Sequence, residues 1–339
     1  MSDYVCRSIN INNNLINGPG LAPHPSPVPP PQPGLCSKLY VGDVSNNSIS
    51  VIDPSTGLVI DTIENLNDRP YQIYFNPYTN QIIASLSYTP GRELIFIDPQ
   101  TDTVTNTIRF DNLDSVDGIL YNPNTNLYYI ASYYGNQVAI VDGTTFEEVA
   151  QIFVPAPYQL ALDPATDLVY APAAFSNYVS VISGTNEVDR IVVGEPEFGL
   201  YPAEIALNAT TRRAYVSLRE GNSIAVIDTA TNTLVTTIPL AGRPRGIDVD
   251  PVTDKVYVAL TLPLGQLIEI DGNTNTVTNT LEISDYTWDV VVDTLNNFAY
   301  VTDRQNFTVS TIDLSTFSVV QTTEIGGEPT TLAIYYYEC

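Results

Sequence analysis

A short turn of one composition recurs along most of the chain at nearly constant spacing, and this repeat constrains the fold more than any other feature. The turn begins with Asp, or once with Ser, and successive copies lie 41 to 45 residues apart. The seven copies are Asp53-Pro-Ser-Thr, Asp98-Pro-Gln-Thr, Asp142-Gly-Thr-Thr, Ser183-Gly-Thr, Asp228-Thr-Ala-Thr, Asp271-Gly-Asn-Thr and Asp313-Leu-Ser-Thr. An Asp at the first position accepts a hydrogen bond from the backbone two residues on, and Pro or Gly suits a tight bend. These Asp residues are therefore predicted to form turns rather than to catalyse a reaction.

A second turn precedes each of these, and alternating apolar residues flank both. The earlier turn begins at Asn76, Asn122, Asp163, Asn208, Asp250 and Asp293. The strand after it carries Tyr-Val or a near relative, and no window has a sustained helical period. Each unit therefore reads as four strands joined by turns. Four strands in about 40 to 50 residues are typical of one blade of a β-propeller.

The repeats resemble a known family at this level of detail. The segments Tyr215-Val216-Ser217, Ile224 to Asp228 and Thr231 to Val235 are similar to the YVTN repeat of surface-layer-type β-propellers. The resemblance covers about residues 38–335. It implies a propeller fold and, because the best-known members are cell-surface proteins, a place on a cell surface. It implies no shared chemistry.

The two ends of the repeat region complement one another. The first unit begins at Leu39 with its second strand, and residues 329–334 resemble the opening strand of a unit, as in residues 244–249. The last strand is therefore expected to be the innermost strand of the first blade, which removes the open edges of a linear array. We predict an all-β, seven-bladed propeller over residues 37–339, closed by its C-terminal strand.

The cysteines lie only near the chain ends. Aligning Pro329 with Pro244 and Tyr40 with Tyr257 places Cys339 and Cys36 at the two cut ends of one hairpin turn. This predicts an intrachain disulfide, and closing a loop of about 300 residues stabilises a fold by about 5 kcal/mol on the chain-entropy model. Three unrelated free thiols are the alternative. Cys6 is left over, and an odd cysteine suggests a bond to another chain.

Residues 1–18 and 19–36 differ from the repeats. Val5, Arg7, Ile9 and Ile11 alternate with polar residues, which predicts a strand-forming connector arm. Eight prolines at positions 19–33 favour a polyproline II spacer, which at about 3.1 Å per residue reaches roughly 45 Å. A disordered tail is the alternative.

Composition argues against several functions. The chain has 13 Lys and Arg against 38 Asp and Glu, a net charge of −25, which disfavours a nucleic-acid partner. Its one histidine, His24, lies in the Pro-rich stretch, so no His-based metal site or catalytic triad is expected in the blades. We therefore expect no enzyme activity, no cofactor and no resident metal, and reject a lactonase-like hydrolase. A weakly held divalent cation is left open.

No targeting or membrane segment is recognisable. No apolar run reaches the roughly 18 residues that span a bilayer, so no membrane insertion is expected. Residues 1–17 lack the charged and apolar regions of a secretory signal. The chain is therefore expected to stay inside the cell, to leave by lysis or another route, or to be given without its signal.

The mouth of the propeller channel is the default place for a site. The position two residues after the first-strand proline, or its equivalent, is occupied by Gln72, Gly118, Gln159, Glu204, Gly246, Asp289 and Thr331. Glu204 and Asp289 are its only carboxylates, and we interpret them as rim charges, a cation site or an acid–base pair. Arg243, Arg245 and Arg69 lie beside this position and either pair with the acids or hold an anionic ligand. Trp288 is expected to be a core residue.

Two functions fit these features. The first is a structural, self-assembling protein of the cell or spore surface, whose arm joins a neighbouring propeller into a filament or layer through Cys6. The second is a ligand-binding or adhesive module that uses the channel mouth.

Overall fold

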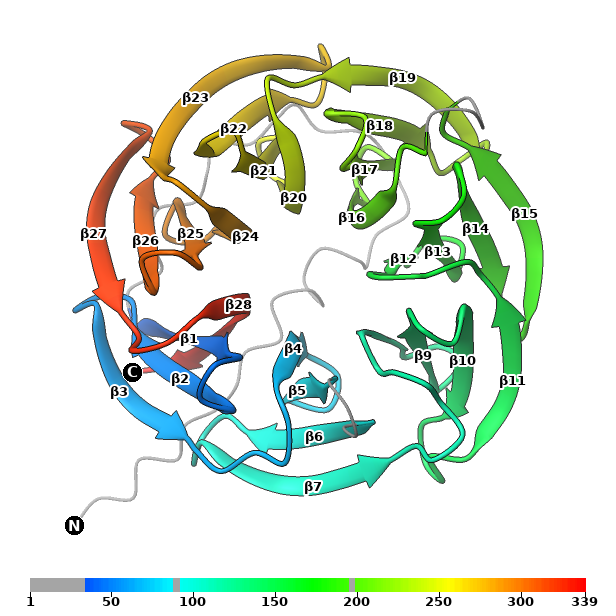
Figure 1. Ribbon diagram of the computed structural model, residues 1–339, viewed down its shortest axis with the longest axis horizontal. Coiled ribbons are helices and arrows are strands. Elements are labelled where there is room, and N and C mark those ends of the chain that lie inside the picture. The colour runs from blue at the N-terminus through cyan, green and yellow to red at the C-terminus, as the bar shows by residue number, and fades with distance from the viewer. Residues whose placement is uncertain (1–33, 88–91, 195–198) are drawn as a thin grey trace.

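Seven four-stranded antiparallel sheets surround a central channel, as the repeat predicts (Figure 1). The computed structural model describes residues 34–87, 92–194 and 199–339. Within these ranges no residue is helical, and hence no helix is available to cross a membrane. The connector arm with Val5, Cys6, Arg7, Ile9 and Ile11 lies outside the described residues.

Each blade runs from an inner strand at the channel to an outer strand at the rim. From the channel outward, blades 1 to 3 consist of β28 (Pro329–Glu338), β1 (Leu35–Asp43), β2 (Ser48–Asp53) and β3 (Leu58–Ile63); β4 (Pro70–Asn76), β5 (Gln81–Leu86), β6 (Glu93–Asp98) and β7 (Thr103–Arg109); and β8 (Gly118–Asn122), β9 (Leu127–Ser132), β10 (Gln137–Asp142) and β11 (Glu148–Phe153). Blades 4 and 5 consist of β12 (Ala161–Asp163), β13 (Leu168–Ala173), β14 (Tyr178–Ser183) and β15 (Asn186–Val192); and β16 (Pro202–Asn208), β17 (Arg213–Leu218), β18 (Ser223–Asp228) and β19 (Thr233–Pro239). Blades 6 and 7 consist of β20 (Arg243–Asp250), β21 (Lys255–Leu262), β22 (Gly265–Asp271) and β23 (Thr276–Ser284); and β24 (Thr287–Asp293), β25 (Phe298–Asp303), β26 (Thr308–Asp313) and β27 (Ser318–Glu324).

The C-terminal strand closes the ring. Strand β28 pairs antiparallel with β1, from Leu35 opposite Glu338 to Asp43 opposite Pro329. A disulfide joins Cys36 to Cys339, with 5.4 Å between their Cα atoms and a sequence separation of 303. The predicted circle and its covalent joint are therefore both present. Strand β1 begins at Leu35, so the last two residues of the predicted spacer belong to the first blade.

The repeated turns form because an Asp or Asn side chain accepts a backbone hydrogen bond two residues on. In the turn after the third strand of blade 1, the amide of Ser55 donates to Asp53 Oδ1 at 2.9 Å. In the earlier turn of blade 5, the amide of Thr210 donates to Asn208 Oδ1 at 3.0 Å. Equivalent bonds recur at Asn76, Asp98, Asn122, Asp142, Asp163, Asp228, Asp250, Asp271, Asp293 and Asp313.

Seven apolar clusters, each between two adjacent blades, hold the sheets together. The tyrosine of the repeated Tyr-Val pair is fully buried in most blades and reaches the next blade. Tyr129 donates to the carbonyl oxygen of Gly184 at 2.9 Å, and Tyr170 donates to Asn232 Oδ1 at 2.8 Å. A buried hydroxyl needs a partner, and here that partner lies in the neighbouring sheet.

The inner strands depart from regular pairing where they begin. In blades 1, 2, 5, 6 and 7 the register between the first and second strands shifts by one residue near this end, which places one extra residue on the inner strand. In three of these blades a hydroxyl of the second strand accepts the amide that the bulge frees. The pairs are Gln72 with Ser85 at 3.0 Å, Glu204 with Ser217 at 2.9 Å, and Asp289 with Thr302 at 2.9 Å. The residue after the Tyr-Val pair thus has a structural role.

Candidate site at the channel mouth

The seven equivalent residues predicted to line the channel mouth mainly form contacts between neighbouring blades. We use the name channel mouth for Tyr71, Tyr158, Glu204, Arg245, Trp288 and Asp289, near the start of the inner strands. The side chain two residues after the first-strand proline accepts an amide from the next inner strand in four blades. These bonds are Ile119 N to Gln72 Oε1, Ile205 N to Gln159 Oε1, Leu332 N to Asp289 Oδ2 and Ile73 N to Thr331 Oγ1.

In two further blades the same position must be glycine because the next blade approaches too closely. A Cβ atom at Gly118 would lie 2.2 Å from the carbonyl oxygen of Tyr158. One at Gly246 would lie 2.5 Å from the Cα of Asp289. Both neighbours are backbone atoms, which have little room to move. Six of the seven positions are therefore explained by packing between blades.

Glu204 is the exception. Its side chain is 6% exposed, and its carboxylate accepts no hydrogen bond from any described residue. The nearest cation is Arg245, whose Nε lies 4.0 Å from Glu204 Oε1. A buried carboxylate is costly unless it is paired and hydrogen-bonded, so this residue is not explained by stability.

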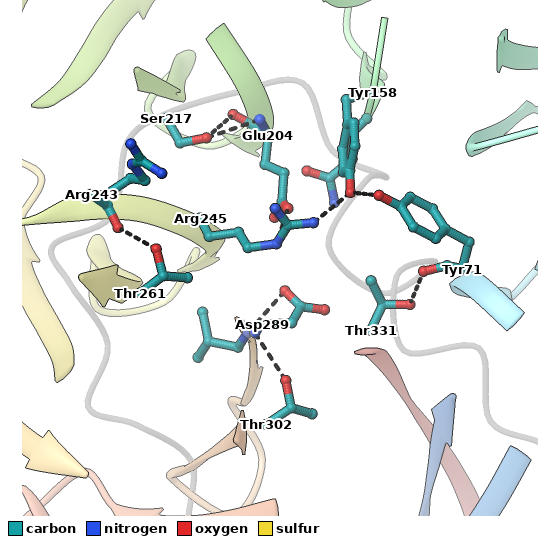
Figure 2. A network of polar contacts seen from close by, with 12 residues as sticks. Tyr71, Tyr158, Glu204, Ser217, Arg243, Arg245, Thr261, Asp289, Thr302 and Thr331 are labelled. Atoms are coloured by element: carbon teal, nitrogen blue, oxygen red, sulfur yellow. Dashed lines mark hydrogen bonds and ion pairs between the residues drawn. The ribbon is translucent and has the colours of Figure 1, made fainter. Parts of the chain in front are cut away.

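Arg245 occupies the centre of the mouth (Figure 2). It is 2% exposed, and its guanidinium carbon lies 3.1 Å from the ring centroid of Trp288 and 5.4 Å from that of Tyr158. One terminal nitrogen donates to Tyr158 Oη at 2.5 Å, and Tyr158 shares a hydrogen bond with the Tyr71 hydroxyl. Within the described part of the chain, the buried Nε of Arg245 has no hydrogen-bond partner. The mouth therefore contains both an acceptor and a donor that lack hydrogen-bond partners.

Burial controls the charge of this cluster. It raises the pKa of Glu204, against the opposing effect of the Arg245 and Arg219 guanidinium groups. Burial also raises the pKa of Asp289 well above its usual value, and the nearby Glu204 raises it further. The tyrosine hydroxyls of Tyr71 and Tyr158 have raised pKa values, again mainly through burial. At neutral pH these tyrosines are therefore hydrogen-bond donors.

The structure brings together three of the predicted mouth residues and separates the fourth. Glu204, Arg245 and Asp289 lie around one point (Figure 2), whereas Arg243 pairs with Glu220 at 2.8 Å. Trp288, expected in the core, is buried as predicted. Its neighbours include two arginines, since the guanidinium carbons of Arg245 and Arg304 lie 3.1 and 4.0 Å from its ring centroid.

Sequence reasoning missed the aromatic residues of the mouth and of its surroundings. Tyr71 and Tyr158 each come directly after the first-strand proline. The repeat predicts the next residue, Gln72 or Gln159, to line the channel, and in a regular strand the tyrosine before it would face the other way. A series of rings continues outward from Tyr158: Tyr133, then Tyr134 and Phe175, then Tyr201. The guanidinium carbon of Arg219 lies 5.2 Å from the Tyr201 ring centroid, and its buried Nε has no hydrogen-bond partner among the described residues. The signal was available, since Tyr133 and Arg219 both come directly after the second strand of a blade.

A cavity of about 470 Å³ occupies the channel on the other side of the inter-blade bonds. Gln72, Gln159, Asp289 and Thr331 line it, together with apolar residues of the inner strands. Asp248 also lines it and accepts the amides of Val249 and Val292, both at 2.8 Å. Burial nevertheless raises the pKa of Asp248 to about 6.

Metal binding has little support in these residues. Among the described residues no group of three His, Cys, Asp or Glu is placed to hold an ion. Asp111 pairs with Arg109 at 2.8 Å, and Asp117 turns inward to the hydroxyl groups of Ser115 and Ser87. The chemistry that the mouth does offer is hydrogen bonding and ion pairing by a carboxylate, a guanidinium and tyrosine hydroxyls.

Comparisons with known proteins support the fold and go no further. No family model matches the chain, and no curated protein matches it. A functionally unknown protein from Desulfotomaculum acetoxidans is similar in structure, with a TM-score of 0.72 at 14% identity over 88% of this chain and 98% of that one. Hydrazine synthase from Kuenenia stuttgartiensis has a TM-score of 0.67 at 15% identity over 77% and 88% of the two chains. AztD from Citrobacter koseri has a TM-score of 0.66 at 14% identity over 90% and 99%.

The seven sheets and these structural similarities show a seven-bladed β-propeller fold, and the similarities assign no activity to the chain. The YVTN family membership stays a prediction from the repeats.

Proposed function

We propose that this protein is a structural subunit that assembles with copies of itself through its N-terminal arm. The arm of one copy adds to the edge of an outer strand in a neighbouring propeller. Cys6 links two copies by a disulfide to Cys6 of another arm, because Cys36 and Cys339 are already paired with each other. Because the two contact surfaces differ, repeated contacts of this kind build an open filament or layer unless their rotation closes a ring.

The outer strands carry this proposal. Each sheet ends at its rim in an outer strand that has one edge unpaired by any described residue. These strands are β3, β7, β11, β15, β19, β23 and β27. They hold 13 of the 20 large hydrophobic residues that are exposed among the described residues, and none contains a lysine. Lysines and short strands are common means of keeping an edge from pairing. Here a bulge in each outer pair is the main restraint.

Strand β19 is the most open of these edges by composition. Its sequence, Thr-Leu-Val-Thr-Thr-Ile-Pro, contains no charged residue, whereas every other outer strand has at least one. Leu234 and Val235 are 37% and 44% exposed. An added strand gains backbone hydrogen bonds along such an edge, and its alternate side chains pack against these residues.

The arm has the matching chemistry in its sequence. Val5, Ile9 and Ile11 supply alternate apolar side chains, and Arg7 is a cation in a chain of net charge −25. The spacer reaches roughly 45 Å as polyproline II, which is long enough to leave its own first blade. The Cys36–Cys339 disulfide favours an oxidising location, and we propose the outside of a cell or spore.

Electrophoresis with and without reductant tests the covalent joint. Because each chain has one unpaired cysteine, the full chain is expected to give a dimer band without reductant and a monomer band with it. Cys6→Ser should remove the dimer band, while the matched double variant Cys36→Ser/Cys339→Ser should keep it. A dimer band that persists in Cys6→Ser would overturn the role of this cysteine.

The unpartnered groups of the channel mouth favour a second function, ligand binding. We propose it as an activity of the assembled protein, because the outer strands and the mouth are separate surfaces. Deleting residues 1–33 should abolish assembly and leave binding at the mouth intact.

A further inference from the structure

We propose that the channel mouth and its aromatic rim bind an acidic saccharide through a carboxylate of the sugar. This names the ligand of the second function above and rests on it, whereas it does not depend on assembly. We define the aromatic rim as Tyr133, Tyr134, Phe175 and Tyr201. It comprises the rings that follow Tyr158, and Arg219 packs on it.

Two guanidinium groups supply the anion-binding part. The charges of Arg245 and Arg219 both act on the carboxylate of Glu204. Each has a buried Nε without a hydrogen-bond partner among the described residues. Neither has a hydrogen-bonded carboxylate among those residues, whereas the neighbouring Arg243 and Arg304 pair with Glu220 and Glu328. Planar guanidinium groups with free donors match the two oxygens of a carboxylate.

The rim supplies flat apolar faces next to these donors. Tyr134 is 68% exposed and Phe175 is 64% exposed, each in ring contact with Tyr133. The Tyr133 and Tyr201 hydroxyls lie 2.7 Å apart, which fixes the two rings relative to each other. Exposed rings that are held in place can pack against the C–H face of a sugar, and the tyrosine hydroxyl remains in contact with water.

Glu204 and the aromatic rim together distinguish a sugar from a simple anion. A bound sulfate has no hydrogen to donate to a carboxylate, and neither sulfate nor phosphate gains from aromatic faces. A sugar acid presents a carboxylate to the arginines, hydroxyl donors to Glu204 and an apolar ring face to the rim. The combination of an unpartnered acceptor, unpartnered donors and aromatic faces therefore favours an acidic saccharide over a free anion or an acidic peptide.

Isothermal titration calorimetry with trigalacturonate on the full chain tests this proposal. Saturable binding is expected, with about tenfold weaker affinity in Arg219→Gln and a smaller loss in Phe175→Ala. The matched controls lie on outer strands. Arg190→Gln removes an arginine whose guanidinium carbon lies 4.8 Å from the ring centroid of Tyr178, and Phe153→Ala removes a ring that is 66% exposed. Both controls should bind as the unchanged chain does.

Three competing probes separate the outcomes. A neutral trisaccharide could bind as tightly and lose the same affinity in Arg219→Gln and Phe175→Ala. That result would overturn the proposal of an acidic sugar and retain saccharide binding at the mouth. Equal affinity for triglutamate or inorganic phosphate would overturn the saccharide. Absence of heat with every probe would overturn the proposed ligand and the binding function together, while the disulfide-linked dimer band that tests the assembly function would be unaffected.

Discussion

The outer hairpins and the channel mouth are built on the same seven blades but differ in how closely the blades copy one another. In the outer hairpins, one Asx hydrogen bond recurs from blade to blade, as at Asp53 and Asp313. At the mouth, equivalent positions hold Gln, Gly, Glu, Asp and Thr. One repeated hydrogen bond is sufficient to build the outer turn of each blade, whereas the seven equivalent inner-strand positions hold five residue types.

This difference separates residues that hold the ring together from residues that are free for another role. Gln159 and Glu204 occupy equivalent positions in adjacent blades. Gln159 accepts the amide of Ile205 at 2.9 Å, whereas Glu204 accepts no hydrogen bond from any described residue. A residue that departs from the repeat and accepts no hydrogen bond from a neighbouring described residue is a candidate for ligand binding.

The largest effect on the free energy of unfolding is expected from the disulfide that joins the two ends of the ring. Cys36→Ser/Cys339→Ser opens a loop of 303 residues and should lower the free energy of unfolding by up to about 5 kcal/mol on the chain-entropy model. Equilibrium urea unfolding measures it, with Cys6→Ser as the control that should not change. An unaltered unfolding midpoint in the double variant would mean that the noncovalent contacts of β28 close the ring alone.

The next largest change in unfolding free energy is expected where the inner strands pack against each other. Gly246→Ala places a Cβ 2.5 Å from the Cα of Asp289 and should cost about 2 to 3 kcal/mol of unfolding free energy, as overpacking against backbone does. In the outer hairpins, Ser315→Ala changes an exposed turn residue and should stay within about 0.5 kcal/mol. Similar losses in the two variants would remove the contrast between the regions.

The third effect is a pH dependence that originates in the channel. Burial raises the pKa of Asp248 from 3.8 to about 6, so the native state holds this proton more tightly than the unfolded state does. Stability from this group is therefore present at low pH and is lost as pH rises from about 4 to about 6. Asp250, Asp289 and Tyr336 are the titratable groups coupled to it.

Asp248→Asn, which resembles the protonated acid, should lose this dependence. Between pH 4 and pH 7 the variant should gain about 2 kcal/mol in unfolding free energy relative to the unchanged chain. Urea unfolding at several pH values measures the difference. A constant difference between the two proteins would show that Asp248 titrates as an exposed carboxyl does.

The smallest effect compares the two equivalent positions directly. Gln159→Ala leaves the amide of Ile205 without its acceptor and should cost about 1 to 2 kcal/mol. Glu204→Gln removes a carboxylate whose pKa is raised because its burial outweighs the attraction of Arg245 and Arg219, so stability at pH 7 should be unchanged or higher. An equal loss in Glu204→Gln would assign Glu204 to the framework of the ring.

The sequence was sufficient to predict the fold because its information is local and repeated. An Asp or Asn at the start of a turn, such as Asp228 or Asn208, forms its bond within four residues. The disulfide between Cys36 and Cys339 followed from the same alignment of repeats.

The mouth was only partly predictable, for a physical reason. A bulge at the start of the inner strand brings consecutive residues such as Tyr71 and Gln72 to the channel side, whereas simple alternation selects one of them. Partners there come from blades far apart in sequence, as when Arg245 donates to Tyr158. Glu204, Arg245 and Asp289 were found by position, and their shared environment required the folded ring.

Electron microscopy of the purified protein tests most directly whether this propeller is an assembly subunit. Images of negatively stained full chain should contain rows or filaments of rings, and a chain beginning at Gly34 should give single rings under the same conditions. Single rings in both samples, at concentrations where the truncated chain is folded, would contradict the account.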